Sequence, residues 1–388
     1  MAHPLPGTPL YVHVPFCVHK CPYCDFFSIE GAGQDPEALV DTLLAEAARA
    51  APQAPRTVFL GGGTPSYLAP ETLARLLTGL DARTGYRASA VEVTLECNPE
   101  SLTAEKVELL ADHGVGRLSI GVQSLDPATL AFFERPHGPD EALAALELAR
   151  SGPIAAFSAD LIHGSPTEPA ETFAANLRRV LELEPHHISA YSLIYEPGTP
   201  LHERLARGEF EPQDEEGELA GLELTRATLR SAGYDQYEVS NFSSNGNHCE
   251  HNINYWHNGD YVGIGPSAVS HVAGRRFGNA RSLARWTRGV QDEDGAPNWE
   301  ERLAPRARLG ETWWLGLRLL AGLDPEQARH TAGWPGAGGD SASATPDPCL
   351  ELANRLVEEG HLVHDAGRYR LAESSLDLAD HVGRRFLA

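Results

Sequence analysis

The sequence predicts an α/β protein whose core is a parallel β-sheet covered by helices on its outer side. Six short runs rich in Val, Ile and Leu alternate with segments of helical periodicity, and repeated strand–helix units favour parallel pairing. The runs are apolar almost without interruption, which indicates burial on both faces of the sheet. Together these features favour a full or partial (β/α) barrel over an open sheet.

The expected strands and helices alternate through the first half of the chain. Strands are expected at residues 9–15, 56–62, 91–98, 116–124, 154–164 and 186–197. Helices are expected between them at residues 35–50, 69–80, 103–114, 140–152 and 168–183. Their apolar residues recur at i, i+3, i+4 and i+7, which gives each helix one face to pack against the sheet.

The pattern divides the chain into three parts. We expect the barrel to span residues 1–235. Residues 236–300, rich in Asn, His, Gly and aromatic residues, are expected to be irregular with short strands. Residues 301–388 are expected to form a smaller α+β, winged-helix-like domain. It would comprise an amphipathic helix at 310–323, a low-complexity loop at 332–347, and then a helix, two short strands and a helix.

The composition narrows the class of protein. The chain of 388 residues has a formal net charge of −23, which disfavours nucleic-acid binding because phosphate contacts need clustered Lys and Arg. No apolar run is long enough to span a membrane, so membrane association is expected to be peripheral at most. The first residues lack a basic region followed by an apolar one, so no signal peptide is expected. We therefore expect a cytoplasmic protein whose cysteines are reduced and available as ligands or catalytic thiols.

Polar and glycine residues stand at the end of each expected strand. In (β/α) barrels the carboxyl ends of the strands carry the chemistry. Turns need Gly, Asn and Pro in any case, but six such endings together predict one large site at a common mouth.

A cluster of three cysteines follows the first expected strand. Cys17, Cys21 and Cys24 have the spacing C-x3-C-x2-C. A structural zinc site normally needs four ligands, and His13 or His19 could supply the fourth. A cubane iron–sulfur cluster is the favoured alternative, because three thiolates would leave one iron open to a small molecule.

The cysteine motif, with an aromatic residue just before its last cysteine, resembles that of the radical S-adenosylmethionine (SAM) superfamily. The resemblance implies a partial (β/α)6 TIM-like barrel and a [4Fe-4S] cluster on Cys17, Cys21 and Cys24. It also implies that the amino and carboxylate groups of SAM bind the fourth iron, and that SAM undergoes one-electron cleavage.

The resemblance also implies a set of SAM contacts. The stretch "GGGTPS" resembles a motif in which Gly62, Gly63 and Thr64 contact the methionyl amino group. Glu96 resembles the carboxylate that binds the ribose hydroxyls, and Arg135 would pair with the SAM carboxylate. The remaining implied contacts are Tyr11, Tyr23, Gln123 and Asp160. Each alone is more often a surface pair or a capped turn, but together they fall in order along the chain.

Longer stretches resemble the family that contains oxygen-independent coproporphyrinogen III oxidase. They include "LYVHVPFCVHKCPYCDFFS", "RLSIGVQS", "YEVSNF" and "GDYVGIGPSA". Phe26 stands where the oxidase has a further cysteine, and only about eight residues precede the first expected strand, where the oxidase has a longer segment. With "CDF" and "HNINY", the chain is more similar to the HemW-type haem chaperones of this family.

This second resemblance implies haem as a cofactor or cargo and a haem-accepting respiratory protein as a partner, with a homodimer as a further possibility. It associates the HNxxY motif, here His251, Asn252 and Tyr255, with haem. A neutral imidazole is a credible axial ligand of iron. However, a His in an Asn-rich turn is also often a structural residue, and Cys249 and His248 are neighbouring candidates.

Two other functions stay open from the sequence. The apparently complete set of SAM contacts also suits an enzyme acting on a tetrapyrrole, either a coproporphyrinogen oxidase or a radical methyltransferase. Phe26 and the short N-terminus disfavour the oxidase. The third hypothesis is a zinc-binding structural protein. Cys97 and Cys349 are expected to be ordinary buried thiols.

Overall fold

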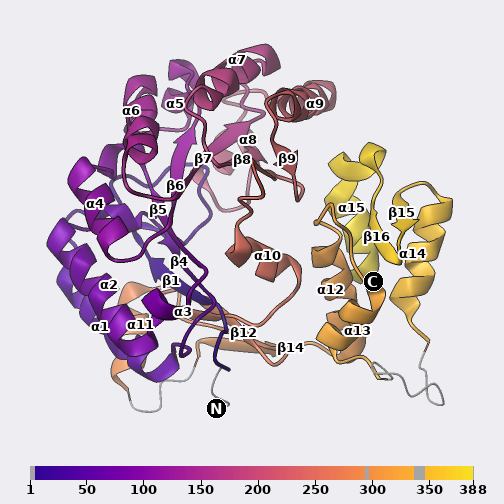
Figure 1. Cartoon of the computed structure of the whole chain (residues 1–388). Helices are drawn as coiled ribbons and strands as arrows, with labels where there is room; N and C mark the ends of the chain where they lie inside the picture. Colours follow the sequence, from indigo (N-terminus) through magenta and orange to yellow (C-terminus); the bar gives the residue numbers. More distant parts are fainter. Residues whose placement is uncertain (1–4, 293–296, 336–345, 388) are drawn as a thin grey trace.

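A nine-stranded sheet, mostly parallel, forms the larger part of the molecule (Figure 1). The structure, a computed structural model, describes residues 5–292, 297–335 and 346–387. Six parallel strands make the centre of the sheet: β1 (Leu10–Val14), β4 (Thr57–Gly62), β5 (Glu92–Cys97), β6 (Arg117–Gln123), β7 (Ala156–His163) and β8 (His187–Ser192). Over the described residues the outermost strands, β11 and β9, do not pair with each other. The sheet is therefore the partial barrel that the sequence predicts.

Helices cover the outer face of this sheet (Figure 1). Those predicted are α1 (Pro36–Ala50), α2 (Pro70–Thr84), α4 (Ala104–Asp112), α6 (Pro139–Ser151) and α7 (Ala170–Leu181). The larger part of the molecule has four further helices, which the sequence did not predict: α3 (Tyr86–Ser89), α5 (Pro127–Phe132), α8 (Pro200–Ala206) and α9 (Glu215–Ser231). Side-chain caps fix several helix starts: Asp35 accepts from the Ala38 amide and Thr103 from the Lys106 amide. None of the described helices is long and apolar enough to cross a membrane.

Alternate residues of each strand face the helices and the barrel interior. On β5, Val93, Leu95 and Cys97 join the main hydrophobic core beneath the helices. Glu92 and Glu96 make polar contacts inside the barrel. On this strand two of the side chains that face the interior are therefore acidic, one near each end.

The segment expected to be irregular, 236–300, extends both edges of the sheet. It contains β10 (Asn241–Ser243), α10 (Glu250–Trp256), β11 (Val262–Ile264), β12 (Val269–Val272), β13 (Arg275–Gly278) and α11 (Leu283–Gln291). Strand β10 pairs antiparallel with β8 and with β9 (Asp235–Gln236), whereas β11 pairs in parallel with β1. The chain thus crosses between the sheet edges, and α10 lies in that crossing (Figure 1).

The C-terminal part has its own core. It contains α12 (Pro305–Gly316), α13 (Pro325–Ala332), α14 (Pro348–Glu358), the hairpin β15 (Leu362–Asp365) and β16 (Arg368–Leu371), and α15 (Ala379–Arg384). Trp313 stacks on Phe386 at a centroid distance of 5.2 Å within this core.

One predicted helix is displaced in the C-terminal part. The helix expected at 310–323 begins at Pro305 and ends at Gly316. Proline suits the first turn of a helix, since it lacks an amide that would need a partner there. Beyond the helix, Leu319 forms a β-bridge with Glu238. The backbone of Leu319 therefore pairs with the segment that follows β9 and does not continue the helix. Strand β14 (Trp299–Arg302), in a stretch expected to be turn-rich, pairs with β13.

Candidate functional site

The three clustered cysteines lie on the loop after β1, here called the cluster loop (residues 15–30). Its base is closed by β2 (Phe16–Cys17) and β3 (Ile29–Glu30), which pair in parallel. The Cys24 amide donates to the Cys21 carbonyl at 3.1 Å, and this turn brings the last two thiols to the same part of the loop. Cys17 and Cys21 are buried, and Cys24 is half-buried.

The histidines considered as a fourth zinc ligand are both engaged elsewhere. His13 contacts the Tyr11 hydroxyl and the Phe27 carbonyl, at 2.9 and 2.8 Å. His19 pairs with Glu30 at 2.9 Å. As they stand, no three His, Cys, Asp or Glu side chains of the described ranges are grouped as ligands of one metal ion.

Each clustered thiol has a polar neighbour. The Thr64 hydroxyl donates to Cys17 Sγ at 3.4 Å, and Arg135 Nη1 donates to Cys21 Sγ at 3.2 Å. Ser28 Oγ lies 4.0 Å from Cys24 Sγ. Burial raises the pKa of Cys17 to about 11 and also raises the pKa of Cys24. Hydrogen-bond donors and a buried guanidinium beside such thiols stabilise their thiolate forms, so this donor set fits a thiolate-ligated iron–sulfur cluster.

Asn98 connects two of these contacts. Its Nδ2 donates to Thr64 Oγ1 at 2.9 Å, and its Oδ1 accepts from Arg135 Nη2 at 2.7 Å. An unbroken chain of hydrogen bonds therefore runs from Cys17 to Cys21 through three side chains. Asn98 was not predicted as a site residue, although it stands in the strand ending "ECNPES", because its partners lie more than thirty positions away in the sequence.

Arg135, which the resemblance places at SAM, also has contacts within the protein. The resemblance implied that it pairs with the SAM carboxylate, but Nη1 and Nη2 are used by Cys21 and Asn98. Its Nε is buried and has no hydrogen-bond partner. Nη2 also donates to the Gly121 carbonyl at 3.1 Å. A ligand acceptor at Nε would satisfy this remaining buried donor, so the side chain can contact the cluster loop and an anionic ligand together.

The glycines of "GGGTPS" seat the cluster loop against β4. A Cβ on Gly63 would lie 2.6 Å from the backbone carbonyl carbon of Pro15, and Gly62 has a φ of +97°. The amides of Gly63 and Thr64 donate to Val14 and to Phe16. An amino group needs acceptors, so the backbone carbonyls of this motif, not its amides, would receive that of SAM.

Two carboxylates face the interior near the carboxyl ends of their strands. Glu96 accepts from the Gly62 amide at 2.9 Å, and Asp160 accepts from Ser119 and Ser158 at 2.6 and 3.0 Å. Burial, together with the neighbouring Asp160, raises the pKa of Glu96 to about 7. Burial also raises the pKa of Asp160. Such a carboxylate is suited to accept hydrogen bonds from a pair of ribose hydroxyls.

This shifted carboxyl predicts a pH dependence of stability. The pKa of Glu96 is higher in the folded protein than its ordinary value of about 4.5, so the folded state holds the extra proton between these values. The free energy of unfolding of the wild type, relative to Glu96→Gln, is therefore expected to fall as the pH rises from about 5 to about 8. Urea unfolding of both proteins across this range measures the difference, and a flat difference would contradict the assignment.

The three other implied SAM contacts lie around this region. Gln123 has a φ of +66° at a β-bulge between β6 and β7, a left-handed conformation that redirects its side chain. Tyr11 lies in the interior, and its hydroxyl contacts His13. Tyr23 packs edge-on against Phe133 at 5.0 Å in a small apolar cluster. Tyr23 also interacts with the Cys21 side chain through a hydrogen bond.

The HNxxY motif is on α10, at the other end of the strands. His251 is 1% exposed. Its Nδ1 lies 2.8 Å from Thr57 Oγ1, and its Nε2 lies 2.9 Å from the Tyr255 hydroxyl. Burial lowers the pKa of His251 to about 3, so the ring is neutral. Both ring nitrogens have partners inside the protein, which favours the structural role of His251 over axial ligation of haem iron, the two readings that the sequence left open.

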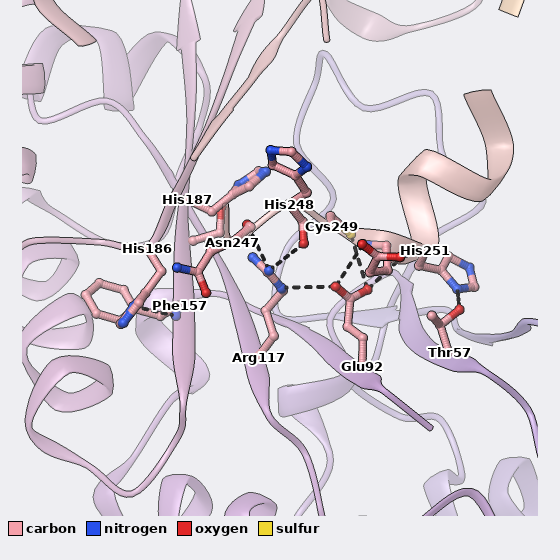
Figure 2. A network of polar contacts seen from close by, with 12 residues as sticks. Thr57, Glu92, Arg117, Phe157, His186, His187, Asn247, His248, Cys249 and His251 are labelled. Carbon is pink, nitrogen blue, oxygen red and sulfur yellow. Dashed lines mark hydrogen bonds and ion pairs between the residues drawn. The ribbon is translucent and has the colours of Figure 1, made fainter. Parts of the chain in front are cut away.

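A buried network fastens this motif to the strands (Figure 2). Arg117 Nε lies 3.5 Å from Glu92, and Arg117 Nη2 donates to the carbonyls of Asn247 and His248. Glu92 accepts from the amides of Glu250 and His251 and from the Cys249 thiol. Cys249 is therefore also engaged, and burial raises its pKa.

The position of this network separates the motif from the cysteines. Thr57, Glu92 and Arg117 are the first residues of β4, β5 and β6, whereas the cluster loop follows the carboxyl end of β1. The HNxxY motif thus lies at the amino end of the barrel, whereas the cysteines and the residues expected to contact SAM lie toward the carboxyl end.

Comparison with known proteins identifies the family of the chain. Residues 11–180 match the model of the radical SAM superfamily. The haem chaperone HemW of Lactococcus lactis is 31% identical over 377 residues, which cover 97% of this chain and 96% of the relative. That of Haemophilus influenzae is 36% identical and covers 95% of each chain. That of Escherichia coli is 40% identical over 69% of this chain and 71% of the relative.

The same architecture occurs in a solved structure. The radical SAM enzyme coproporphyrinogen III oxidase from Escherichia coli superposes with a TM-score of 0.81, covering 99% of this chain and 90% of the enzyme. At 23% identity this likeness shows the fold alone. The near full-length relatives show the family. The chain belongs to the HemW-type haem chaperone family of the radical SAM superfamily.

Proposed function

We propose that this protein is a haem chaperone that binds a [4Fe-4S] cluster, SAM and haem, and delivers haem to a haem-dependent respiratory protein. The observation that carries the proposal is the similarity, over nearly the whole chain, to relatives named haem chaperones. Phe26 supports it from within the sequence, since the resemblance places it where the oxidase has a further cysteine.

The residues of the carboxyl end would hold the first two cofactors. Cys17, Cys21 and Cys24 would ligate the cluster, which when bound supplies an electron and an open iron for SAM. Glu96 would accept the ribose hydroxyls, and the free Nε of Arg135 would hold an anionic group of SAM. These side chains orient SAM and exclude water from it.

Haem would bind away from His251. The cluster loop carries two exposed apolar side chains, Val18 and Phe26, which are 45% and 71% exposed. Exposed apolar groups of this kind suit the face of a tetrapyrrole, so we place haem at the carboxyl end.

The unpaired thiols of all six cysteines support a reducing, cytoplasmic location.

One anaerobic preparation tests the proposal. The reconstituted protein is expected to contain about four irons with sulfide, and to show a saturable Soret change when haem is added. A preparation with one zinc per chain would favour a zinc protein. Assays with reductant, SAM and coproporphyrinogen III, read by product mass, test the alternative enzyme. Catalytic formation of protoporphyrinogen, or the absence of saturable haem binding, would overturn the chaperone proposal.

A further inference from the structure

We infer that His251 and Tyr255 are positioning residues for the SAM site, which they support from beneath through Phe59 and Tyr11. The inference rests on the proposed cofactor site at the carboxyl end. It gives the HNxxY motif a role other than contact with haem. The argument follows one path of contacts through the barrel interior.

The first step fixes the His251 ring. The hydroxyls of Thr57 and Tyr255 lie 2.8 and 2.9 Å from its two nitrogens. A neutral imidazole donates from one nitrogen and accepts at the other, and each hydroxyl can do either. The ring therefore has both bonds satisfied and one defined orientation. To bind iron it would have to break a bond and leave a site where it is 1% exposed.

The second step passes from the motif to the strands. The Phe59 ring lies 5.3 Å from the His251 ring and is tilted by 31° to it. The Phe59 ring also lies 6.3 Å from the Tyr11 ring. Tyr11 and Phe59 are direct partners in the register of β1 and β4. The side chains of the motif and of the two strands thus form one packed stack.

The third step reaches the carboxylate proposed to bind ribose. A Cβ on Gly61 would lie 2.5 Å from Glu96 Oε2 and 2.9 Å from Phe59 Cε1. The Phe59 ring and the Glu96 carboxylate therefore pack against the same backbone position. A shift of the Phe59 ring would therefore change the packing around the Glu96 carboxylate, since packed interiors transmit small displacements.

A second branch reaches the cluster loop. The Tyr11 hydroxyl lies 2.9 Å from His13 Nδ1, and His13 Nε2 lies 2.8 Å from the Phe27 carbonyl. His13 also lies where a Cβ on Gly62 would be, at 2.2 Å. Two paths of contacts therefore lead from His251 to the proposed cofactor site. One reaches Glu96, and the other reaches the cluster loop.

The sharpest test removes a partner of His251 that cannot touch haem. Thr57 is 1% exposed, and Thr57→Val keeps its shape while removing its hydroxyl. We expect Thr57→Val and Tyr255→Phe to retain iron but to weaken SAM binding about three- to tenfold, the range for one lost hydrogen bond. Equilibrium dialysis with SAM measures the affinity, and the change that SAM causes in the electron paramagnetic resonance of the reduced cluster reports the site. Haem titration of both variants should match the wild type.

A matched control separates positioning from general destabilisation. Leu356→Ala opens a cavity in the C-terminal core, and it should lower stability without changing SAM affinity. Unchanged SAM binding and resonance in Thr57→Val would overturn the inference. Loss of the Soret change in His251→Phe with wild-type SAM binding would do so too, because it would assign axial ligation. Failure of the wild type itself to bind SAM would instead overturn the cofactor proposal.

Discussion

Replacing Cys21 by alanine is expected to abolish binding of the iron–sulfur cluster. The cluster loop has three thiols, so one of the four irons of a cubane cluster already has no cysteine ligand. Loss of Cys21 would leave a second iron without one. Removing Cys21 also leaves Arg135 Nη1 without the acceptor that it contacts at 3.2 Å. After anaerobic reconstitution, iron should fall from about four atoms per chain to fewer than one. Iron and sulfide analysis with the absorption spectrum measures this loss.

The chain supplies a control for this variant. Cys349 is fully buried in the C-terminal core, where burial holds its pKa well above its ordinary value. Cys349→Ala is expected to keep its full iron content. If Cys21→Ala also kept about four irons, a fourth protein ligand would have to exist, and His19 on the same loop would be the first to replace.

The strands of the barrel could be predicted because the apolar residues of each strand are consecutive in the sequence. Each predicted central strand lies within a few residues of the observed one, since near-continuous apolar runs have few other structures in an α/β chain. Strand β8 shows where this reasoning fails. It was expected to reach residue 197 but ends at Ser192. The apolar residue that follows, Leu193, packs into the small cluster around Phe133 instead, and periodicity does not distinguish these two burials.

Some features of the site could also be predicted from neighbouring residues in the sequence, whereas others depend on contacts between distant residues. The cysteine spacing is local, so the cluster loop could be found from the sequence. The contacts of Asn98 and Thr57 join residues more than thirty positions apart, and no pattern near either residue indicates its partner. The motif carrying His251 was recognised, but its end of the barrel was not. That end depends on the pairing of β10 and β11 with opposite edges of the sheet.

The second large effect is expected at the amino end of the barrel, where Glu92→Gln should destabilise the protein by about 3–5 kcal/mol. That is the usual cost of breaking a buried ion pair from one side, and both side chains of the Glu92–Arg117 pair are 8% exposed. The substitution leaves the Arg117 charge buried, and it weakens the acceptor for the amides of Glu250 and His251. Urea unfolding of the cluster-free protein measures the change.

Two further variants show whether the charge pair, rather than mutation of this region in general, causes the loss. Arg56 and Glu250 form an ion pair nearby, with side chains 61% and 43% exposed, so Arg56→Gln should cost at most about 1 kcal/mol. The double variant Glu92→Gln, Arg117→Met should recover part of the lost stability, because it leaves no unpaired charge in the interior. A loss in Glu92→Gln no larger than that of Arg56→Gln would contradict the prediction. The interior would then tolerate the unpaired guanidinium, and the carbonyls of Asn247 and His248 alone would be sufficient to hold it.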